Sequence, residues 1–115
     1  MTVMELAQTI GARVLLPGKA GHGEIARICA GDRMSDLLEQ AASDTLLVTR
    51  LSNPHLARVA ELMDVPGICL VQNIAPEPGL LSAAAACGTA LMVSPLELEE
   101  TCRRLERGLL AGKKA

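Results

Sequence analysis

The chain has 115 residues, of which half are apolar and none is Phe, Tyr or Trp, and its formal charge is −2. This length predicts one domain over residues 1–115, with a core made of aliphatic side chains. The scattered basic residues and the missing aromatic rings argue against nucleic-acid binding. No apolar run is long enough to span a membrane, and Glu5 and Gln8 interrupt any signal-peptide pattern, so we expect a cytoplasmic protein.

The first part of the chain predicts a helix followed by two strands. Apolar residues recur at helical spacing in residues 2–10, and Gly11 stands where a helix end favours a positive φ. The glycine-rich segment 17–23 fits neither the P-loop nor the dinucleotide fingerprint. We interpret it as a flexible connection, with the alternative that Lys19 and backbone N–H groups bind an anion. The two short strands are expected at residues 13–16 and 24–30.

The next stretch predicts a helix and then a buried strand. The helix prediction rests on apolar residues at positions i, i+3, i+4 and i+7, namely Met34, Leu37, Leu38 and Ala41. The strand prediction rests on residues 45–49, a mainly apolar run bounded by turn residues. Polar residues follow this strand directly.

Strand and helix patterns then alternate along the chain. The apolar strands begin at Thr45, Ile68 and Ala90, which are 23 and 22 residues apart, enough for one strand and one helix. Such alternation is typical of parallel βαβ units with right-handed crossovers. We therefore predict an α/β layered sandwich, with a mainly parallel sheet of about five short strands flanked by amphipathic helices.

Capping patterns predict where three of these helices begin or end. Asn53 and Pro54 have the form of a cap followed by the first helical residue. Residues 94–97, Ser-Pro-Leu-Glu, have the form of a capping box. Gly88 follows a helix introduced by prolines, and residues 112–115 are expected to form a disordered tail.

A polar border is expected where the parallel strands end, because ligands bind outside the carboxyl ends of such strands. Thr49, Gln72 and Ser94 end three strands and should share one border. The fold does not require Arg50, whose guanidinium suits a carboxylate or a phosphate. The predicted ligand-binding residues are Asp32, Ser35, Thr49, Arg50, Asn53 and Gln72.

Each of these residues also has a structural interpretation. Asp32 fits equally well as the N-cap of the following helix and as part of a ligand site. Capping alone explains Asn53. A third hypothesis is a small enzyme that pairs Asp32 or Asp36 with His55, although no Ser-His-Asp or Cys-His set is evident. We expect no catalytic residues.

The four cysteines show no metal or redox spacing. They contain no C-x-x-C pair, and each lies in an apolar setting, at Cys29, Cys69, Cys87 and Cys102. We interpret them as free cysteines that act as small apolar side chains. No metal and no cofactor are expected.

The order of segments resembles the DRTGG domain family, which is similar to the N-terminal domain of HPr kinase/phosphorylase. The resemblance covers residues 13–105, although Met34-Ser35-Asp36 stands where the family name has Thr-Gly-Gly. It implies an accessory module of the kind found beside CBS domains and before phosphotransacetylase catalytic domains, without kinase activity. The matching segments are Gly31-Asp32-x-x-Ser35-Asp36-Leu37-Leu38, Leu47-Val48-Thr49, Asn53-Pro54-His55 and Val65-Pro66-Gly67-Ile68.

Together these observations predict a non-catalytic regulatory or accessory domain. We expect it to self-associate, as a homodimer or higher oligomer, and to bind a small anionic metabolite or nucleotide at the carboxyl ends of its strands. The alternative is a pure interaction module for a metabolic enzyme or signalling partner, acting through a sheet edge or through the Ala-rich helix at residues 78–87.

Overall fold

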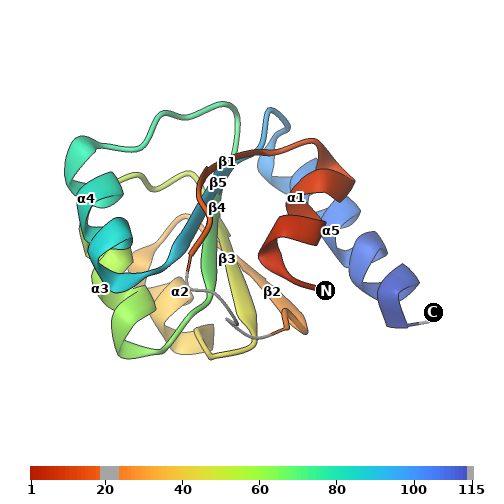
Figure 1. Ribbon diagram of the computed structural model, residues 1–115, viewed down its shortest axis with the longest axis horizontal. Coiled ribbons are helices and arrows are strands. Elements are labelled where there is room, and N and C mark those ends of the chain that lie inside the picture. The colour runs from red at the N-terminus through yellow and green to blue at the C-terminus, as the bar shows by residue number, and fades with distance from the viewer. Residues whose placement is uncertain (19–23, 114–115) are drawn as a thin grey trace.

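The computed structural model describes residues 1–18 and 24–113, and it has three layers, with a five-stranded sheet between two groups of helices (Figure 1). This confirms the predicted α/β sandwich. The elements are α1 (Val3–Ile10), β1 (Arg13–Leu16), β2 (Arg27–Ala30), α2 (Met34–Gln40), β3 (Thr45–Thr49), α3 (His55–Leu62), β4 (Gly67–Leu70), α4 (Pro78–Cys87), β5 (Ala90–Val93) and α5 (Leu98–Lys113).

The sheet has the strand order β1-β5-β4-β3-β2. Strands β2 to β5 are parallel, and β1 pairs antiparallel with β5. From β2 to β5, each new strand is added next to the previous one and always on the same side of it. Right-handed crossovers therefore place the connecting helices α2, α3 and α4 on one face of the sheet. Helices α1 and α5 cover the other face (Figure 1). The register pairs Thr49 with Leu70 and Leu70 with Val93, which aligns the carboxyl ends of these strands.

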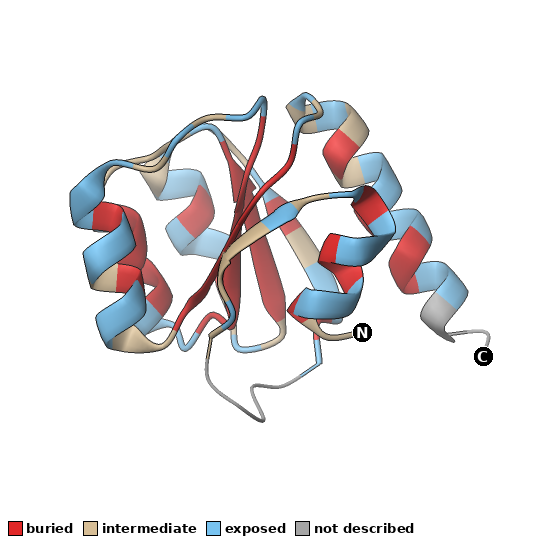
Figure 2. Cartoon of the chain, turned by 45° about the horizontal axis from the view of Figure 1, so that its top comes forward, coloured by how far each residue is buried: buried red, intermediate tan, exposed pale blue. Residues whose placement is uncertain are grey.

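The core consists of two aliphatic clusters, one on each face of the sheet. All residues of β3, β4 and β5 are buried, whereas the helices present exposed residues outward (Figure 2). Side chains alternate between faces along a strand. On β3, Leu47 therefore packs under α2 and α3, while Leu46 and Val48 pack under α1 and α5.

Several predicted boundaries are wrong by a few residues. Strand β2 begins at Arg27 rather than at residue 24, and Leu38, expected in the core, is 45% exposed. The capping box does not form, because α5 begins at Leu98. The Ser94 hydroxyl instead accepts a hydrogen bond from Leu96 N (3.1 Å) and shares one with the Thr101 hydroxyl (2.9 Å), which closes the preceding loop.

Two sequence predictions lie partly or wholly outside the described residues. The anion-binding alternative for the glycine-rich loop depends on residues 19–23. The predicted disordered tail includes residues 114–115, while the backbone of residues 112–113 belongs to α5.

Gly11 ends α1 with a positive φ of 69°, as the sequence predicts. A Cβ atom added there would meet none of the described residues within 4 Å, so Gly11→Ala introduces backbone strain without a steric clash among them. We expect it to lower the free energy of unfolding by about 1 kcal/mol. Urea unfolding followed by far-UV circular dichroism measures this loss. Gly11→Asn is the control and should lose less, because Asn tolerates the left-handed conformation.

Candidate functional site

The candidate site lies at the carboxyl ends of the parallel strands. A cavity of about 300 Å³ is lined there by Arg50, Gln72, Glu97, Leu98 and Glu99, and we call it the rim cavity. Arg50 follows β3, Gln72 follows β4, and the other three residues follow β5. Because these strands run parallel and in register, residues far apart in the sequence meet at one border.

Arg50 is held at this border by Asp32, which follows β2. Its guanidinium donates to the Asp32 carboxylate through Nε (3.1 Å to Oδ1) and through Nη2 to Oδ2, so the contact is bidentate. The hydrogen bonds from Arg50 lower the pKa of Asp32, and Asp32 in turn raises the pKa of Arg50. Both side chains are more than one-third exposed, so the pair orients Arg50 more than it stabilises the fold.

The charge around Arg50 is mainly acidic. Glu97 and Glu99 line the same cavity, and Asp32 already neutralises the guanidinium. An anionic ligand must therefore displace Asp32 from Arg50 and must approach two glutamates. The bidentate geometry that holds Asp32 is also the geometry that binds a free carboxylate or phosphate.

The backbone after β4 makes an unusual turn at the same border. Gln72 and Asn73 have φ values of 56° and 54°, and Ile74 N donates to Val71 O (3.1 Å), which defines a type I′ turn. Gln72 N donates to Leu96 O (2.8 Å), and this bond ties the turn to the loop after β5. The left-handed conformation costs about 1–2 kcal/mol at a residue such as Gln72. The turn places the exposed residue Gln72 on the wall of the rim cavity.

The other predicted ligand-binding residues lie elsewhere. Thr49 is buried, and its hydroxyl accepts a hydrogen bond from Leu51 N (3.1 Å) at the end of its own strand. The N-cap of α3 is Pro54 rather than the predicted Asn53. Asn53 lies one residue earlier, where its side-chain oxygen accepts a hydrogen bond from His55 N (3.1 Å). Ser35 is exposed in the first turn of α2. The structure thus brings together Asp32, Arg50 and Gln72.

The alternative in which Asp32 caps α2 is wrong. The N-cap position belongs to Arg33, whose side chain makes no capping hydrogen bond within the described part of the chain. Asp32 lies one residue too early, and its carboxylate binds Arg50 instead.

Sequence reasoning missed Glu97, Leu98 and Glu99 as lining residues of the cavity. The sequence pattern predicts a capping-box role for Glu97, although Glu97 comes after β5 just as Gln72 comes after β4. The position of Glu97 at the border is not evident from the sequence, because the loop after β5 is longer and the border residues lie several positions beyond the strand.

Among the described residues, no hydrogen bond or ion pair joins His55 to Asp32 or Asp36, and no group of three or more His, Cys, Asp or Glu could hold a metal ion. Burial raises the pKa of Cys69 to about 12 and that of Cys102 to about 11. These two thiols are therefore protonated at neutral pH and are poor nucleophiles.

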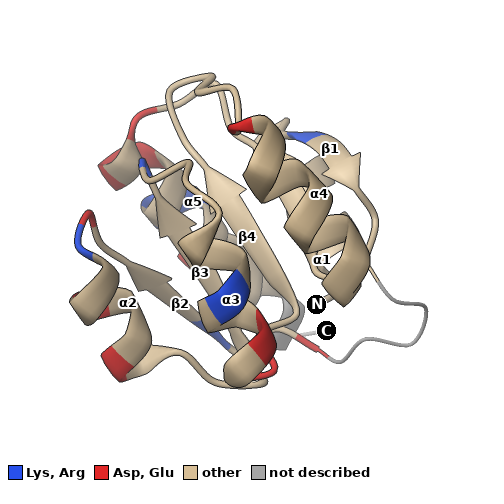
Figure 3. Ribbon diagram, turned by 90° about the vertical axis from the view of Figure 1, so that its left-hand side faces the viewer, with Lys and Arg blue, Asp and Glu red and all other residues tan. Residues whose placement is uncertain are grey.

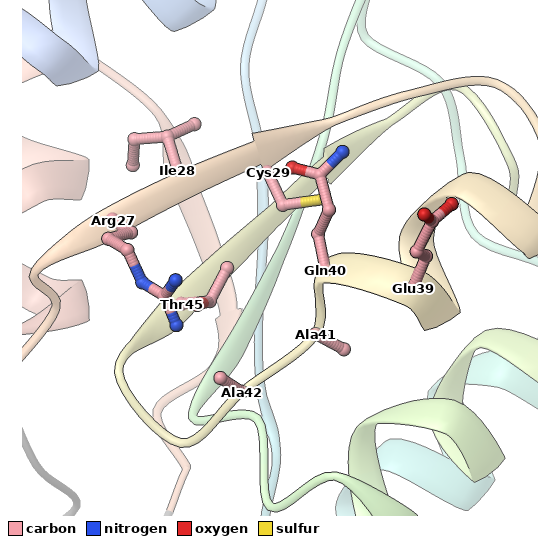
Figure 4. Close-up of a pocket in the computed structure, with 8 residues that line it drawn as sticks. All are labelled: Arg27, Ile28, Cys29, Glu39, Gln40, Ala41, Ala42 and Thr45. Atoms are coloured by element: carbon pink, nitrogen blue, oxygen red, sulfur yellow. The ribbon is translucent and has the colours of Figure 1, made fainter.

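A second cavity, of about 320 Å³, lies between β2 and the end of α2 (Figure 4). We call it the edge pocket. It lies near the starts of β2 and β3, away from the rim cavity, and Arg27 beside it is bound to Asp44 (2.9 Å from Nη2 to Oδ1). The lining residues are Arg27, Ile28, Cys29, Glu39, Gln40, Ala41, Ala42 and Thr45.

Comparison with known proteins reveals a similar fold. No family profile matches the sequence, and no curated protein is similar to it in sequence. A solved structure of the CBS and DRTGG domains of the regulatory region of Clostridium perfringens pyrophosphatase, complexed with the activator diadenosine tetraphosphate, has a TM-score of 0.70. The match has 10% sequence identity and covers 93% of this chain and 46% of that one. This chain therefore spans about half the length of that structure and shares the fold of the part that it matches.

No helix in the described part of the chain is both long and apolar enough to cross a membrane.

Proposed function

We propose that this chain is a non-catalytic, DRTGG-like regulatory domain that binds a small anionic metabolite or nucleotide in the rim cavity and that self-associates. The observation that carries the proposal is Arg50, oriented by Asp32 beside an exposed amide at the carboxyl ends of parallel strands. The similar fold in a regulatory region that binds an activator nucleotide supports it.

The exchange of Asp32 for a ligand is the central step of this proposal. In the structure, Asp32 holds the guanidinium at the border and satisfies its charge. A carboxylate or phosphate takes the same two donors and releases Asp32. The carboxylate of Asp32 then repels the bound anion, so Asp32 acts as an internal competitor that lowers the affinity for the ligand. Because Asp32 directly precedes α2, its release also couples ligand binding to the start of that helix.

Thermal-shift and calorimetric titrations with ATP, AMP, citrate and inorganic phosphate test this site. At least one of these probes should stabilise the protein at millimolar concentration, because a ligand that binds only the folded state raises its stability. Arg50→Ala should weaken that binding about tenfold or more, since it removes a bidentate, charge-assisted contact. Asp32→Asn should strengthen it, since it removes the competing negative charge.

Arg27→Ala is the matched control for Arg50→Ala. Arg27 is also an exposed arginine bound to an aspartate, but it lies at the other end of the strands. Its loss should leave ligand affinity unchanged. No stabilisation by any of the four probes, or equal loss in the two arginine variants, would contradict the assignment to the rim cavity.

A second candidate function is a pure interaction module, as the sequence also suggests. Helix α4 carries no charged residue along its length (Figure 3). Leu81 on α4 is 38% exposed, and Leu62 at the end of α3 is 73% exposed. Both helices return antiparallel to the strands, so they run parallel to each other, and these two leucines lie toward opposite ends of the layer. Leu62 and Leu81 are therefore two separate exposed side chains and not parts of one continuous apolar patch.

A further inference from the structure

The two outer strands of the sheet, β1 and β2, present different backbone edges. The pairing of β1 with β5 shifts register between Val14 and Leu16, and such bulges blunt an edge against further strand pairing. By contrast, β2 pairs with β3 in unbroken register over all four of its residues. Within residues 1–18 and 24–113, β2 is thus the regular outer edge.

The hydrogen bonds to β3 show which groups of β2 face outward. Arg27 N donates to Asp44 O (3.1 Å) and Gly31 N donates to Val48 O (3.1 Å), so these two residues direct their N–H groups toward β3. Backbone groups alternate in direction along a strand. The N–H and C=O groups of Ile28 and Ala30 therefore point away from the sheet, where another strand can bind them.

Both faces of this edge leave room for the side chains of an added strand. The edge pocket lies on the α2 face (Figure 4). A cavity of about 390 Å³ lies on the other face, between β2 and α5, and Leu110 on its wall is 61% exposed. Its other lining residues are Ala26, Arg27, Ile28, Glu106 and Leu109. An added strand directs alternate side chains to opposite faces and so meets both cavities.

We propose that β2 pairs antiparallel with β2 of a second copy, so that the two sheets become continuous. This inference rests on the self-association in the proposed function and specifies its surface. The direction follows from Arg27, which begins β2: antiparallel pairing keeps the two copies of Arg27 at opposite ends of the joined edge. Parallel pairing would place the two copies of Arg27 side by side.

The outward groups also select a register. When Ile28 lies opposite Ala30 of the second copy, two such pairs form and exchange about four hydrogen bonds. If the two-fold axis that relates the two copies passes through Ile28 or through Ala30 instead, only one such pair forms, with about two hydrogen bonds. The chosen register places the two-fold axis at Cys29, perpendicular to the sheet. The α5 helices then lie on the same face, where the exposed Leu110 of each copy gains an apolar neighbour.

Ala30→Pro tests the pairing directly. Proline removes the outward N–H of Ala30 and leaves the bonds to β3 intact, which is why edge strands tolerate it. Sedimentation equilibrium between micromolar and 200 micromolar protein should show a dimer for the wild-type chain. The dissociation constant should rise at least tenfold in Ala30→Pro, and the matched control Ala30→Ser, which keeps the N–H, should stay within about twofold of wild type.

The outcomes separate the inference from the proposed function. A monomeric wild-type chain over this range would contradict self-association altogether, and with it the edge pairing. A dimer that Ala30→Pro leaves intact while Ala85→Glu on the outer face of α4 dissociates it would keep self-association and overturn the edge pairing.

If far-UV circular dichroism shows that Ala30→Pro does not fold, crosslinking through Cys29 tests the proposed β2 pairing instead. In the proposed register the two Cys29 Cα atoms lie about 4.5 Å apart, within disulfide range. Diamide takes two electrons and two protons from a pair of thiols. At alkaline pH, chosen because burial raises the pKa of Cys29, it should crosslink the wild-type chain and Cys87→Ser but not Cys29→Ser. A dimeric chain that shows no crosslink through Cys29 would overturn the register.

Discussion

Leu47→Ala should lower the free energy of unfolding by about 3 kcal/mol, within the 2–5 kcal/mol found when a fully buried leucine is truncated. Leu47 is 0% exposed and lies in β3, between its register partners Cys29 on β2 and Ile68 on β4. Its side chain packs beneath α2 and α3, in a sheet layer that cannot easily collapse around a void. Urea unfolding monitored by far-UV circular dichroism measures the change.

The control for this variant is Leu62→Ala. Leu62 is 73% exposed, so its truncation should change stability by no more than about 0.5 kcal/mol. A domain of this size has a total stability of about 5–15 kcal/mol, so the loss at Leu47 is a large fraction of it. Equal effects in the two variants would contradict the packing of β3 described above.

Gly67→Ala is the second substitution with a large expected effect. Gly67 begins β4 close to Val3 at the start of α1, and a Cβ atom there would lie 2.9 Å from Val3 Cγ2 and 3.3 Å from Leu46 Cδ1. Valine is stiff and cannot easily move its methyl group aside. We expect the free energy of unfolding to fall by about 1–3 kcal/mol, as in other overpacked cores.

A double-mutant cycle with Val3→Ala isolates the cause. Removal of the Val3 methyl groups makes space for the new Cβ, so Gly67→Ala should cost less in that background. The coupling between the two sites should be about 1 kcal/mol. Additive effects would show that Gly67 is required for another reason.

The fold was predictable because its strands are short, apolar and separated by clear helix signals. The run at residues 45–49 and the 22–23-residue spacing of the strand starts predict parallel βαβ units, and β3, β4 and β5 form there. Helix ends marked by Gly11 and Gly88 were also predictable, since both have the expected positive φ. What the pattern could not reveal was the strand order or the antiparallel β1, because pairing depends on contacts between distant segments.

The candidate site was predictable only in part. Strand ends selected Arg50 and Gln72, which the structure brings to one cavity. The inward direction of Thr49 and the contact of Asp32 with Arg50 depend on backbone direction and distance, which no local pattern contains. The contribution of Glu97 and Glu99 was hidden because the loop after β5 is longer than the capping box predicts.

The purely aliphatic core has a consequence for spectroscopy. With no Trp, Tyr or Phe in the sequence, the protein has almost no absorption or fluorescence of its own in the near ultraviolet. An adenine or other heteroaromatic ring held in the rim cavity would be the dominant chromophore, so its induced circular dichroism would report occupancy directly. A single tryptophan introduced on the protein surface would likewise emit without background.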